Sequence, residues 1–409
     1  RSLVPDLKVW GISATLGNKE LAREILLGPT ANFAVIDAKI QKKIRVHSLL
    51  PKTMERFPWR GHLGIYLLPQ ALKIVQKNKS TLIFTNTRAQ CEIWFHRLLE
   101  AAPKLAGSIA MHHGSIDKKI RLWVEESLRK EELKVVVCTS SLDLGVDFSP
   151  VENCIQIGST KGVGRFIQRA GRSGHRPQAG SSIYFLPTHA MELIESVALQ
   201  NGIKKQQIED RIPYLNCYDV LIQFLMTLAV GSGFDPVKIY PVITSSFCYQ
   251  TLDKERWHWI LNFLIRGSQS LQHYDEYKKL RQSEDGLLKV ANKGIALRHR
   301  LSMGTIVSGN DLKIRYQKGG YLGSIEEWFI AKLKPGDTFA FSGKILELVR
   351  IQKMEVIVKK SKAKQAKIPA WMGGRMSFSA YLSDLLKKAL FEDQNKKTRE
   401  FHSLIPVFE

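Results

Sequence analysis

The chain has 409 residues, 44% of them hydrophobic, and its 61 Lys and Arg against 38 Asp and Glu give a net charge of +23. This length accommodates roughly two to four domains, and the positive charge indicates a polyanionic partner, although a merely basic protein is the alternative. No run of 18 or more apolar residues occurs, which argues against a transmembrane helix and a membrane partner. The scattered cysteines form no C-x-x-C pair, so we expect reduced cytosolic residues and no metal site.

Residues 1–30 are predicted to be the end of one domain and a linker. An apolar stretch leads to Ser13-Ala14-Thr15, and a short helical pattern then ends at Gly28-Pro29-Thr30. Taken alone, the Ser-Ala-Thr sequence is more simply interpreted as an ordinary strand end.

Residues 31–187 are predicted to form an α/β domain. Short apolar runs alternate with helical patterns, of which residues 120–128 give the clearest apolar stripe. Strands that alternate with helices predict a parallel sheet wound by right-handed crossovers. The expected strands are 40–50, 80–85, 107–112, 134–139, 154–158 and 181–186.

After residue 187 the pattern changes twice. Short helices, including one over 254–265 that begins after Asp253, precede a β-like stretch, which predicts a winged-helix domain over 188–288. Residues 289–409 then alternate in the manner of strands, which predicts a β-rich module with one helix near 381–391.

A polar loop follows the continuously apolar run 135–138. Thr139, Ser140, Gly145 and Asp147 come just past the carboxyl end of this expected strand, where open parallel sheets bind their ligands. Asp147 is alternatively a turn or cap residue.

An arginine-rich turn follows some twenty residues later. In a helix, Gln168 and Arg172 share a face at i, i+4, Arg169 lies beside Arg172, and Arg176 follows four residues on. A row of guanidinium groups opposite a strand-end loop is typical of phosphoryl transfer, because arginine neutralises charge on phosphoryl oxygens.

A basic stretch near the carboxyl terminus contains Trp371 and Arg375. Residues 350–375 hold eight Lys or Arg against one acid, Glu355. Lysines that track phosphates beside a ring that stacks on a base form a platform for single strands. The alternative is a core tryptophan beside a solvated loop. We expect the tryptophans on helical stripes to be core residues: Trp123, Trp257 and Trp259.

Five short motifs together resemble superfamily 2 helicases. They are SAT, LIFTNTR, HHGS, CTSSLDLGVD and QRAGRSG, in that family's order and roughly its spacing. The stretches GSIEEWFIAKLKPGDTFAFSGKILELVRI and IPAWMGGRM resemble Lhr-type helicases, above all the ligase-associated DEXH-box branch. The implied fold is a multidomain α/β protein with a RecA-like parallel sheet domain, a winged-helix domain and a β-rich carboxy-terminal module.

The resemblance implies a role for each site residue. Arg172 becomes the arginine finger, with Gln168 and Arg176 beside it; relatives place a second arginine where this chain has His175, which leaves that second role open. The resemblance also implies nucleotide contacts (Gly145, Asp147, Arg169), nucleic-acid contacts (Arg88, Gly114, Ser115, Thr139, Ser140, Trp371, Arg375) and coupling between domains (Ser13, Thr15). Ser115 is alternatively only an N-cap.

Neither a G-x-x-x-x-G-K-[ST] phosphate loop nor a DExH tetrad occurs in the chain. We therefore expect the carboxy-terminal part of a longer ATP-dependent 3′-to-5′ DNA helicase, with Mg²⁺ held mainly by the absent part. The resemblance implies single-stranded DNA or a DNA/RNA hybrid as substrate, DNA repair beside a ligase and a nuclease, and the bacterial cytoplasm. A nucleic-acid-binding module without catalysis and an RNA helicase are the alternatives.

Overall fold

The structure is a computed structural model, and its contacts divide the chain into two compact units. The smaller unit comprises Arg1–Ser13, Asn18–Ile36 and Arg211–Ser308, and the larger comprises Ala14–Gly17, Asp37–Asp210 and Gly309–Glu409. The residues described are 8–13, 15–28, 34–36, 43–51, 63–143, 151–174, 180–210, 212–267, 278–301, 311–352, 355–363, 366–369, 377–391 and 397–408.

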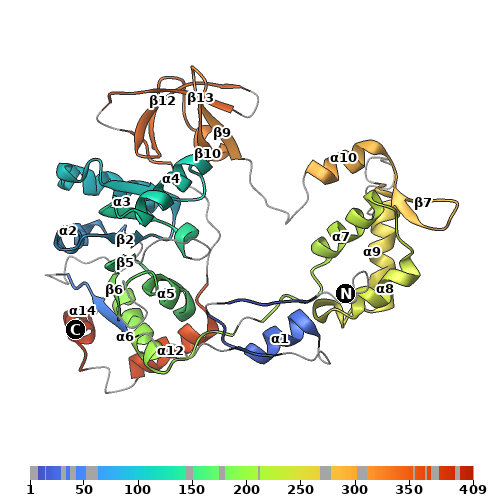
Figure 1. Cartoon of the computed structure of the whole chain (residues 1–409), viewed down its shortest axis with the longest axis horizontal. Coiled ribbons are helices and arrows are strands. Elements are labelled where there is room, and N and C mark those ends of the chain that lie inside the picture. Colours follow the sequence, from blue (N-terminus) through green and yellow to red (C-terminus); the bar gives the residue numbers. More distant parts are fainter. Residues whose placement is uncertain are drawn as a thin grey trace. The chain divides into compact units, whose positions relative to one another are not determined.

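A parallel sheet forms the centre of the larger unit (Figure 1). Within the described residues it has six strands in the order β1-β6-β5-β2-β4-β3, every pair parallel. The strands are β1 (Ile44–Ser48), β2 (Thr81–Phe84), β3 (Ile109–His112), β4 (Val135–Cys138), β5 (Asn153–Ile157) and β6 (Ser181–Leu186). The predicted parallel sheet is confirmed, and its inner strands are buried throughout because helices cover them.

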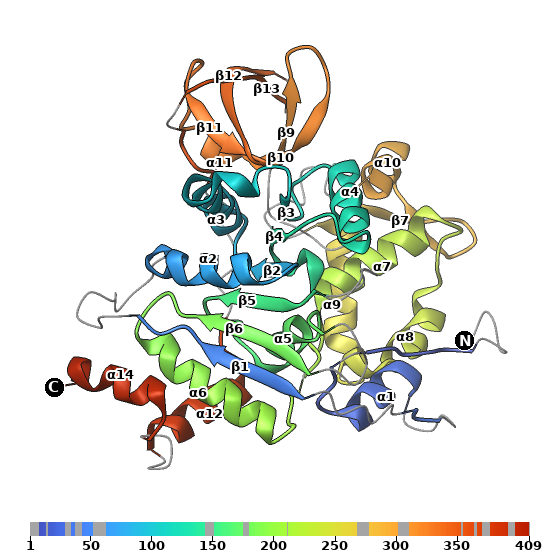
Figure 2. The same cartoon turned by 60° about the vertical axis from the view of Figure 1, so that its left-hand side comes forward.

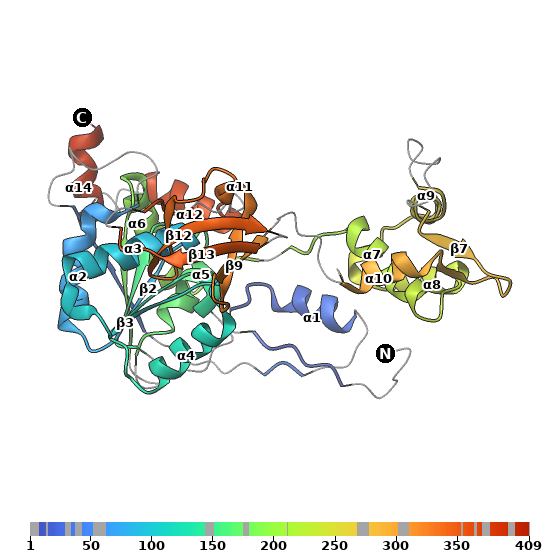
Figure 3. The same cartoon turned by 90° about the horizontal axis from the view of Figure 1, so that it is seen from above.

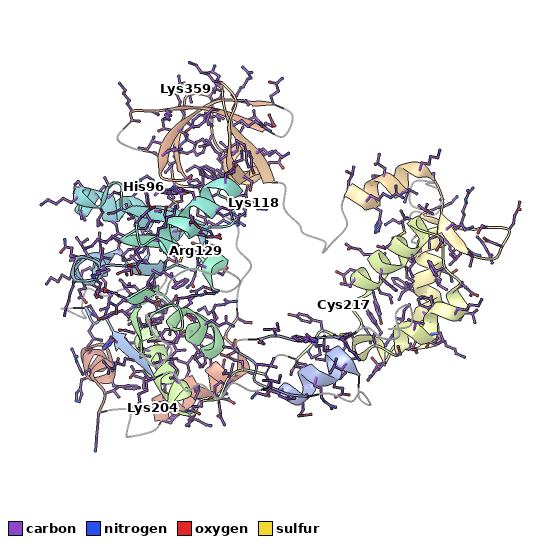
Figure 4. The ribbon with its side chains drawn as sticks, viewed as in Figure 1. His96, Lys118, Arg129, Lys204, Cys217 and Lys359 are labelled. Atoms are coloured by element: carbon purple, nitrogen blue, oxygen red, sulfur yellow. The ribbon has the colours of Figure 1, made fainter. Side chains whose placement is uncertain are left out.

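Helices between these strands pack on the sheet. They are α2 (Leu68–Lys77), α3 (Arg88–Ala101), α4 (Lys118–Arg129) and α5 (Val163–Ala170), and α6 (Met191–Lys204) follows the last strand. Thr87 caps α3 by accepting from the Gln90 amide, and Asp117 caps α4. The predicted stripe on α4 is only partly right, since Val124 and Leu128 are buried whereas Trp123 is exposed. Figure 4 shows the basic side chains of Lys118 and Arg129 at the two ends of α4.

A second, curled sheet belongs to the same unit (Figure 2). Its order is β10-β9-β13-β12-β11, and its pairs are antiparallel except for β13 with β9. The strands are β9 (Asp311–Tyr316), β10 (Tyr321–Glu326), β11 (Thr338–Phe341), β12 (Lys344–Gln352) and β13 (Glu355–Lys360), with the short helix α11 (Glu327–Ile330) between β10 and β11. Lys359 on β13 pairs with Glu347 across the sheet at 2.8 Å (Figure 4).

Glu92 on α3 anchors the curled sheet to the parallel-sheet domain. Its side chain is fully buried and accepts from the amides of Ser342 (2.7 Å) and Gly343 (3.3 Å). These two residues have positive φ and form the two-residue turn between β11 and β12. The backbone twist of a turn with two positive φ values matches the twist of the two strands that it joins. The ring of His113, also fully buried, contacts Glu92 through Nε2 at 3.2 Å.

A second contact joins the strand β10 to the loop after β3. The Ser324 amide donates to the Ser115 carbonyl at 3.0 Å, and the Asp117 amide donates to the Leu322 carbonyl at 3.2 Å. Gly323 lies between them with φ +148°, and a Cβ there would stand 2.0 Å from the Ser115 oxygen. Only glycine fits this approach, so the contact is built into the backbone.

The carboxy-terminal helices return to the parallel sheet domain. Helix α12 (Ala380–Phe391) and helix α14 (Arg399–Phe408) contact α6, and Glu400 accepts from Ser48 Oγ at 2.5 Å. Helix α6 is buried over most of its surface and joins the same core.

The structure therefore groups residues differently from the predicted segments 1–30, 31–187, 188–288 and 289–409. Residues 188–210 and the last helices lie with the parallel sheet, because α6 and α12 bury their apolar faces against each other and the sheet. A change from strand to helix in the sequence is thus not a domain boundary here.

The smaller unit has the winged-helix arrangement (Figure 3). Helices α7 (Tyr218–Val230), α8 (Pro236–Thr244) and α9 (Lys254–Arg266) enclose a core with the hairpin β7 (Leu280–Gln282) and β8 (Leu288–Val290), and α1 (Lys19–Leu27) and α10 (Lys293–Leu301) complete the unit. Trp257 is buried in this core as predicted, whereas Trp259 is exposed and stacks on Phe263. Among the described helices, none combines the length and apolarity needed to cross a bilayer.

Two carboxylates lie buried behind the end of β5. Glu192 accepts from the amides of Ser159 (2.9 Å) and Thr188 (2.6 Å), and Glu195 is joined to Ser159 Oγ at 2.5 Å. Burial, and then the charge of Glu192, raise the pKa of Glu195 to about 8. Glu195 is therefore mostly protonated in the fold at neutral pH, although it ionises in the unfolded chain.

We expect Glu195→Gln to stabilise the larger unit at neutral pH. The pKa of Glu195 is higher in the folded protein than in the unfolded chain. The contribution of its protonated side chain to the free energy of unfolding is therefore complete below about pH 4.5 and is lost as the pH rises towards 8. The amide cannot ionise, so the variant should gain about 1–3 kcal/mol at pH 7 and lose this pH dependence. Denaturant unfolding at pH 5, 6, 7 and 8 measures it; parallel curves for both proteins would contradict the prediction.

Candidate functional site

The carboxyl ends of four neighbouring strands bring polar residues to one edge of the parallel sheet. Thr85 follows β2, His113 follows β3, Thr139 follows β4 and Ser159 follows β5. Because these strands are parallel and adjacent, segments far apart in sequence meet at this edge, where parallel sheets bind ligands.

Helix α5 carries the arginine-rich motif beside this edge. The helix packs on β5 and β6, and Ser173 fixes the residues just after it by accepting from the Ser182 amide at 2.9 Å. Arg172 stands between the end of α5 and this anchor, so its backbone is held at both sides.

Arg169 lies almost completely buried beneath the site. Its Nε and Nη2 donate to the two carboxylate oxygens of Asp143 at 2.8 and 3.3 Å, and its Nη1 donates to Gln156 Oε1 at 2.6 Å. The guanidinium also lies over the ring of Phe84, 5.0 Å from its centroid. The sequence predicts that Arg169 contacts the nucleotide. In the structure its side chain instead binds residues of β2, β5 and the loop after β4, and so fixes α5 against them.

Arg172 uses the same loop in another way. Its Nε and Nη2 donate to the backbone carbonyl of Asp143 at 3.2 and 2.9 Å. Burial lowers the pKa of Arg172 from its ordinary value, while Asp143 acts in the opposite direction. Arginine remains charged after such a shift, so a positive charge is kept in a partly dehydrated position where an anion binds strongly.

Gln168 reaches the predicted coupling segment. Its Nε2 donates to Thr15 Oγ1, although the two residues are 153 positions apart. The structure thus brings Thr15 to the last turn of α5, which ends two residues before Arg172. Ser13 belongs to the smaller unit.

The predicted nucleic-acid contacts surround the ends of β2, β3 and β4. Arg88 is the first residue of α3, Gly114 and Ser140 are exposed, and Thr139 is largely buried with its amide donating to the His112 carbonyl. Ser115 is also buried, and its carbonyl serves the contact with β10.

Beneath this row, Ser141 Oγ lies 2.7 Å from Nδ1 of His112. Burial lowers the pKa of His112 to about 4, although Glu125 opposes the shift, so the ring is neutral at physiological pH. The neutral ring of His112 holds the loop after β4 through its contact with Ser141 and adds no positive charge there.

Five predicted site residues lie outside the described part of the chain: Gly145, Asp147, Arg176, Trp371 and Arg375. Among the described residues, no group of three or more His, Cys, Asp or Glu side chains is placed to hold a metal ion.

Sequence reasoning missed the residues that hold the site together. Asp143 and Gln156 bind Arg169, Ser141 contacts His112, and Glu92 binds the turn of the curled sheet. A signal was present for Gln156, which interrupts the apolar strand β5, since a polar residue inside a buried strand needs a partner.

Two protein families match parts of the chain. Residues 65–176 match the helicase conserved C-terminal domain, and residues 201–368 match the family described as "Large helicase-related protein, winged helix domain". The second match includes helices α7 to α10 of the winged-helix unit and all five strands of the curled sheet.

Similar proteins of known name are helicases. The chain is 30% identical over 367 residues to "ATP-dependent helicase Lhr-Core" of Sulfolobus acidocaldarius, covering 88% of this chain and 41% of that protein. It is 29% identical over 398 residues to the protein of that name from Methanocaldococcus jannaschii, covering 96% and 46%. The chain thus spans less than half the length of these relatives.

A solved structure shares the fold. "Structure of Mycobacterium smegmatis helicase Lhr bound to ssDNA and AMP-PNP" matches with a TM-score of 0.64 and 26% identity, covering 73% of this chain and 38% of that one.

We expect Asp143→Asn to destabilise the larger unit strongly. The variant leaves the buried guanidinium of Arg169 without its counter-charge, and breaking a buried ion pair costs about 3–5 kcal/mol. The matched control is Glu100→Gln, which breaks the exposed pair of Glu100 with Arg97 and should cost under about 1 kcal/mol. Thermal melting of the three proteins measures both changes, and equal effects would show that the buried pair does not stabilise the fold.

Proposed function

Because the chain belongs to the Lhr-type helicase family, we propose that it supplies the second ATP-facing domain of an ATP-dependent DNA helicase or translocase. The observation that carries this proposal is the cluster on α5, where Arg172 is fixed by the Asp143 carbonyl and Gln168 contacts Thr15. A fixed cation that can face phosphate, and a hydrogen bond to the segment proposed to couple the domains, support this proposal.

Arg172 would act as an arginine finger during hydrolysis. ATP is the substrate: water attacks the γ-phosphorus, the bond to the bridging oxygen breaks, and ADP leaves. The guanidinium of Arg172 neutralises charge that spreads over the γ-phosphoryl oxygens in the transition state. The brace of Arg169 on Asp143 keeps this guanidinium in place, so little reorganisation is needed when charge develops.

Mg²⁺ would neutralise phosphate charge when bound. The described residues include no acidic cluster that fits it, so we assign no Mg²⁺ ligand to them and propose that other parts of the protein hold the ion. Gly145 and Asp147 remain our proposed contacts to the nucleotide, and Arg176 remains the candidate for a second arginine.

Gln168 and Thr15 would couple the nucleotide to domain movement. The side chain of Gln168, in the last turn of α5, donates a hydrogen bond to the hydroxyl of Thr15. A change at the phosphate that shifts α5 would therefore also shift Thr15 through this hydrogen bond. We propose that Ser13 takes part in the same coupling between nucleotide and domain movement. Conformational closure of this kind sets the rate of many NTP-driven cycles.

The edge of the sheet would track a nucleic-acid backbone. Arg88 offers charge at the start of α3, Gly114 allows close approach, and the exposed Ser140 offers hydroxyl and amide donors. Ser115 and Thr139 remain proposed contacts, although both side chains are largely buried and the Thr139 amide already donates to the His112 carbonyl. Phosphate contacts of this kind carry no sequence preference, which suits a protein that moves along a strand.

Finer properties are proposed from the resemblance. We propose single-stranded DNA or a DNA/RNA hybrid as the substrate, 3′-to-5′ movement, and a place in DNA repair with a ligase and a nuclease as partners in the bacterial cytoplasm. Trp371 and Arg375 would contact the loaded strand.

A nucleic-acid-binding module without catalysis is the second candidate. Its support is the charge of +23 on a chain that spans less than half of its relatives.

In the full-length enzyme, Arg172→Ala should abolish ATP hydrolysis and leave binding of single strands nearly unchanged. Loss of an arginine finger lowers the rate by about 10³ to 10⁵, and Arg172 faces the nucleotide rather than the strand in this proposal. The control is Arg129→Ala, which removes an exposed arginine paired with Glu126. Steady-state ATPase and oligonucleotide binding are measured together, and activity within tenfold of wild type would show that Arg172 is not the finger.

Trp371→Ala should weaken single-strand binding by the 409-residue chain without altering its salt dependence. A stacking ring contributes about 1–3 kcal/mol, and no charge is lost, so the plot of log affinity against log salt keeps its slope. The control is Trp257→Phe in the winged-helix core, which should lower the melting temperature instead. Titration with labelled DNA and RNA at several salt concentrations also compares the two substrates; unchanged affinity with a lower melting temperature would assign Trp371 to the core.

A further inference from the structure

Helix α5 begins without a capping side chain of its own. Its N-cap residue is Gly162, in an extended conformation, which offers no side-chain acceptor to the first amides of the helix. Unsatisfied amides and the helix dipole both favour a negative group at this end.

Glu209 fills this position from a segment beyond α6. One carboxylate oxygen accepts from the Val163 amide, and the other accepts from the Gly164 amide at 2.8 Å. We propose that Glu209 is a positioning residue for ATP hydrolysis, which holds the helix that carries Gln168 and ends two residues before Arg172. The inference rests on the function proposed for Arg172.

The backbone of α5 is shaped to receive this carboxylate. A Cβ at residue 162 would lie 2.8 Å from Glu209 Oε1, and a Cβ at residue 164 would lie 2.9 Å from Glu209 Oε2 and from Ile208. The φ of Gly162 is −171°, an extended value open to any residue, so at this position glycine is required by the space for Glu209 and not by the backbone. The glycines at positions 162 and 164 thus leave the space that the Glu209 carboxylate occupies at the start of α5.

Glu209 also lies against two other segments. A Cβ at residue 17 would be 2.5 Å from the Glu209 carbonyl oxygen, so the chain that follows Thr15 passes directly over it. Ser379, which caps α12 through the Leu382 amide, donates its hydroxyl to Glu209 Oε1 at 3.2 Å. One carboxylate thus joins the start of α5 to the start of α12 beside the segment that Gln168 contacts.

The two ends of α5 are therefore fixed by different carboxylates. Glu209 holds the first turn, whereas the Asp143 carboxylate holds Arg169 in the last turn and the Asp143 carbonyl holds Arg172 just beyond it. Loss of the first restraint lets the short helix tilt about the second, which displaces Gln168 and Arg172 from their working geometry. Misplacement of a catalytic group by about 1 Å can cost roughly 10²-fold in rate.

Two variants test the inference. Glu209→Ala should lower kcat of the full-length enzyme by about ten- to a hundredfold with little change in KM for ATP, because Arg172 remains but is misplaced. Amide exchange of the segment 163–170 should become roughly tenfold faster in the 409-residue chain. Glu209→Ala with Gly162→Ser should restore most of both losses, because the serine hydroxyl supplies a new cap in the space that the carboxylate leaves.

The matched control is Asp235→Ala, which removes the capping carboxylate of α8 in the smaller unit. It should lower stability and leave kcat and exchange in α5 unchanged. A kcat within twofold of wild type in Glu209→Ala, or a loss that Gly162→Ser does not recover, would overturn the inference. If the wild-type enzyme lacks ATPase, the proposed function fails, whereas unchanged exchange in Glu209→Ala refutes the positioning role independently.

Discussion

The carboxylate of Asp143 and the guanidinium of Arg169 form the interaction on which the candidate site depends. Both groups are almost fully buried, and Gln156 Oε1 accepts a further hydrogen bond from the Arg169 guanidinium. Burying charges in this way is costly unless the geometry is nearly complete, and it gives α5 one orientation relative to the sheet. The carbonyl of the same Asp143 fixes Arg172. Asp143 therefore both stabilises the fold through its carboxylate and positions Arg172 through its carbonyl.

Much of the architecture could be predicted from local pattern. Continuous apolar runs located the central strands, for example Val135–Cys138, because a strand buried on both faces tolerates little else. The positions of the strand-end residues followed from the order of the strands along the chain, whereas the expected helical spacing of Gln168 and Arg172 is interrupted because α5 ends at Ala170. The contact between Gln168 and Thr15 could not be read this way, since 153 residues separate them.

Other failures have distinct physical causes. The sequence predicts that α6 begins a new domain. In the structure α6 packs on the parallel sheet and against α12, which follows it by more than 170 residues in the chain. The periodicity that placed Trp123 and Trp259 in cores reports which face is apolar and not whether that face is covered. Glu92 and Glu209 resemble ordinary surface acids in sequence, and their partners are backbone amides, which leave no trace in side-chain pattern.

The anchoring of the curled sheet has a mechanical consequence. Glu92 lies one turn into the helix that begins at Arg88, and its partner His113 immediately precedes Gly114. The elements proposed to hold a strand are thus fixed to the curled sheet through side chains with no access to water. The start of α3 and the residues after β3 are therefore held in a fixed position relative to the turn between β11 and β12, so these segments move together.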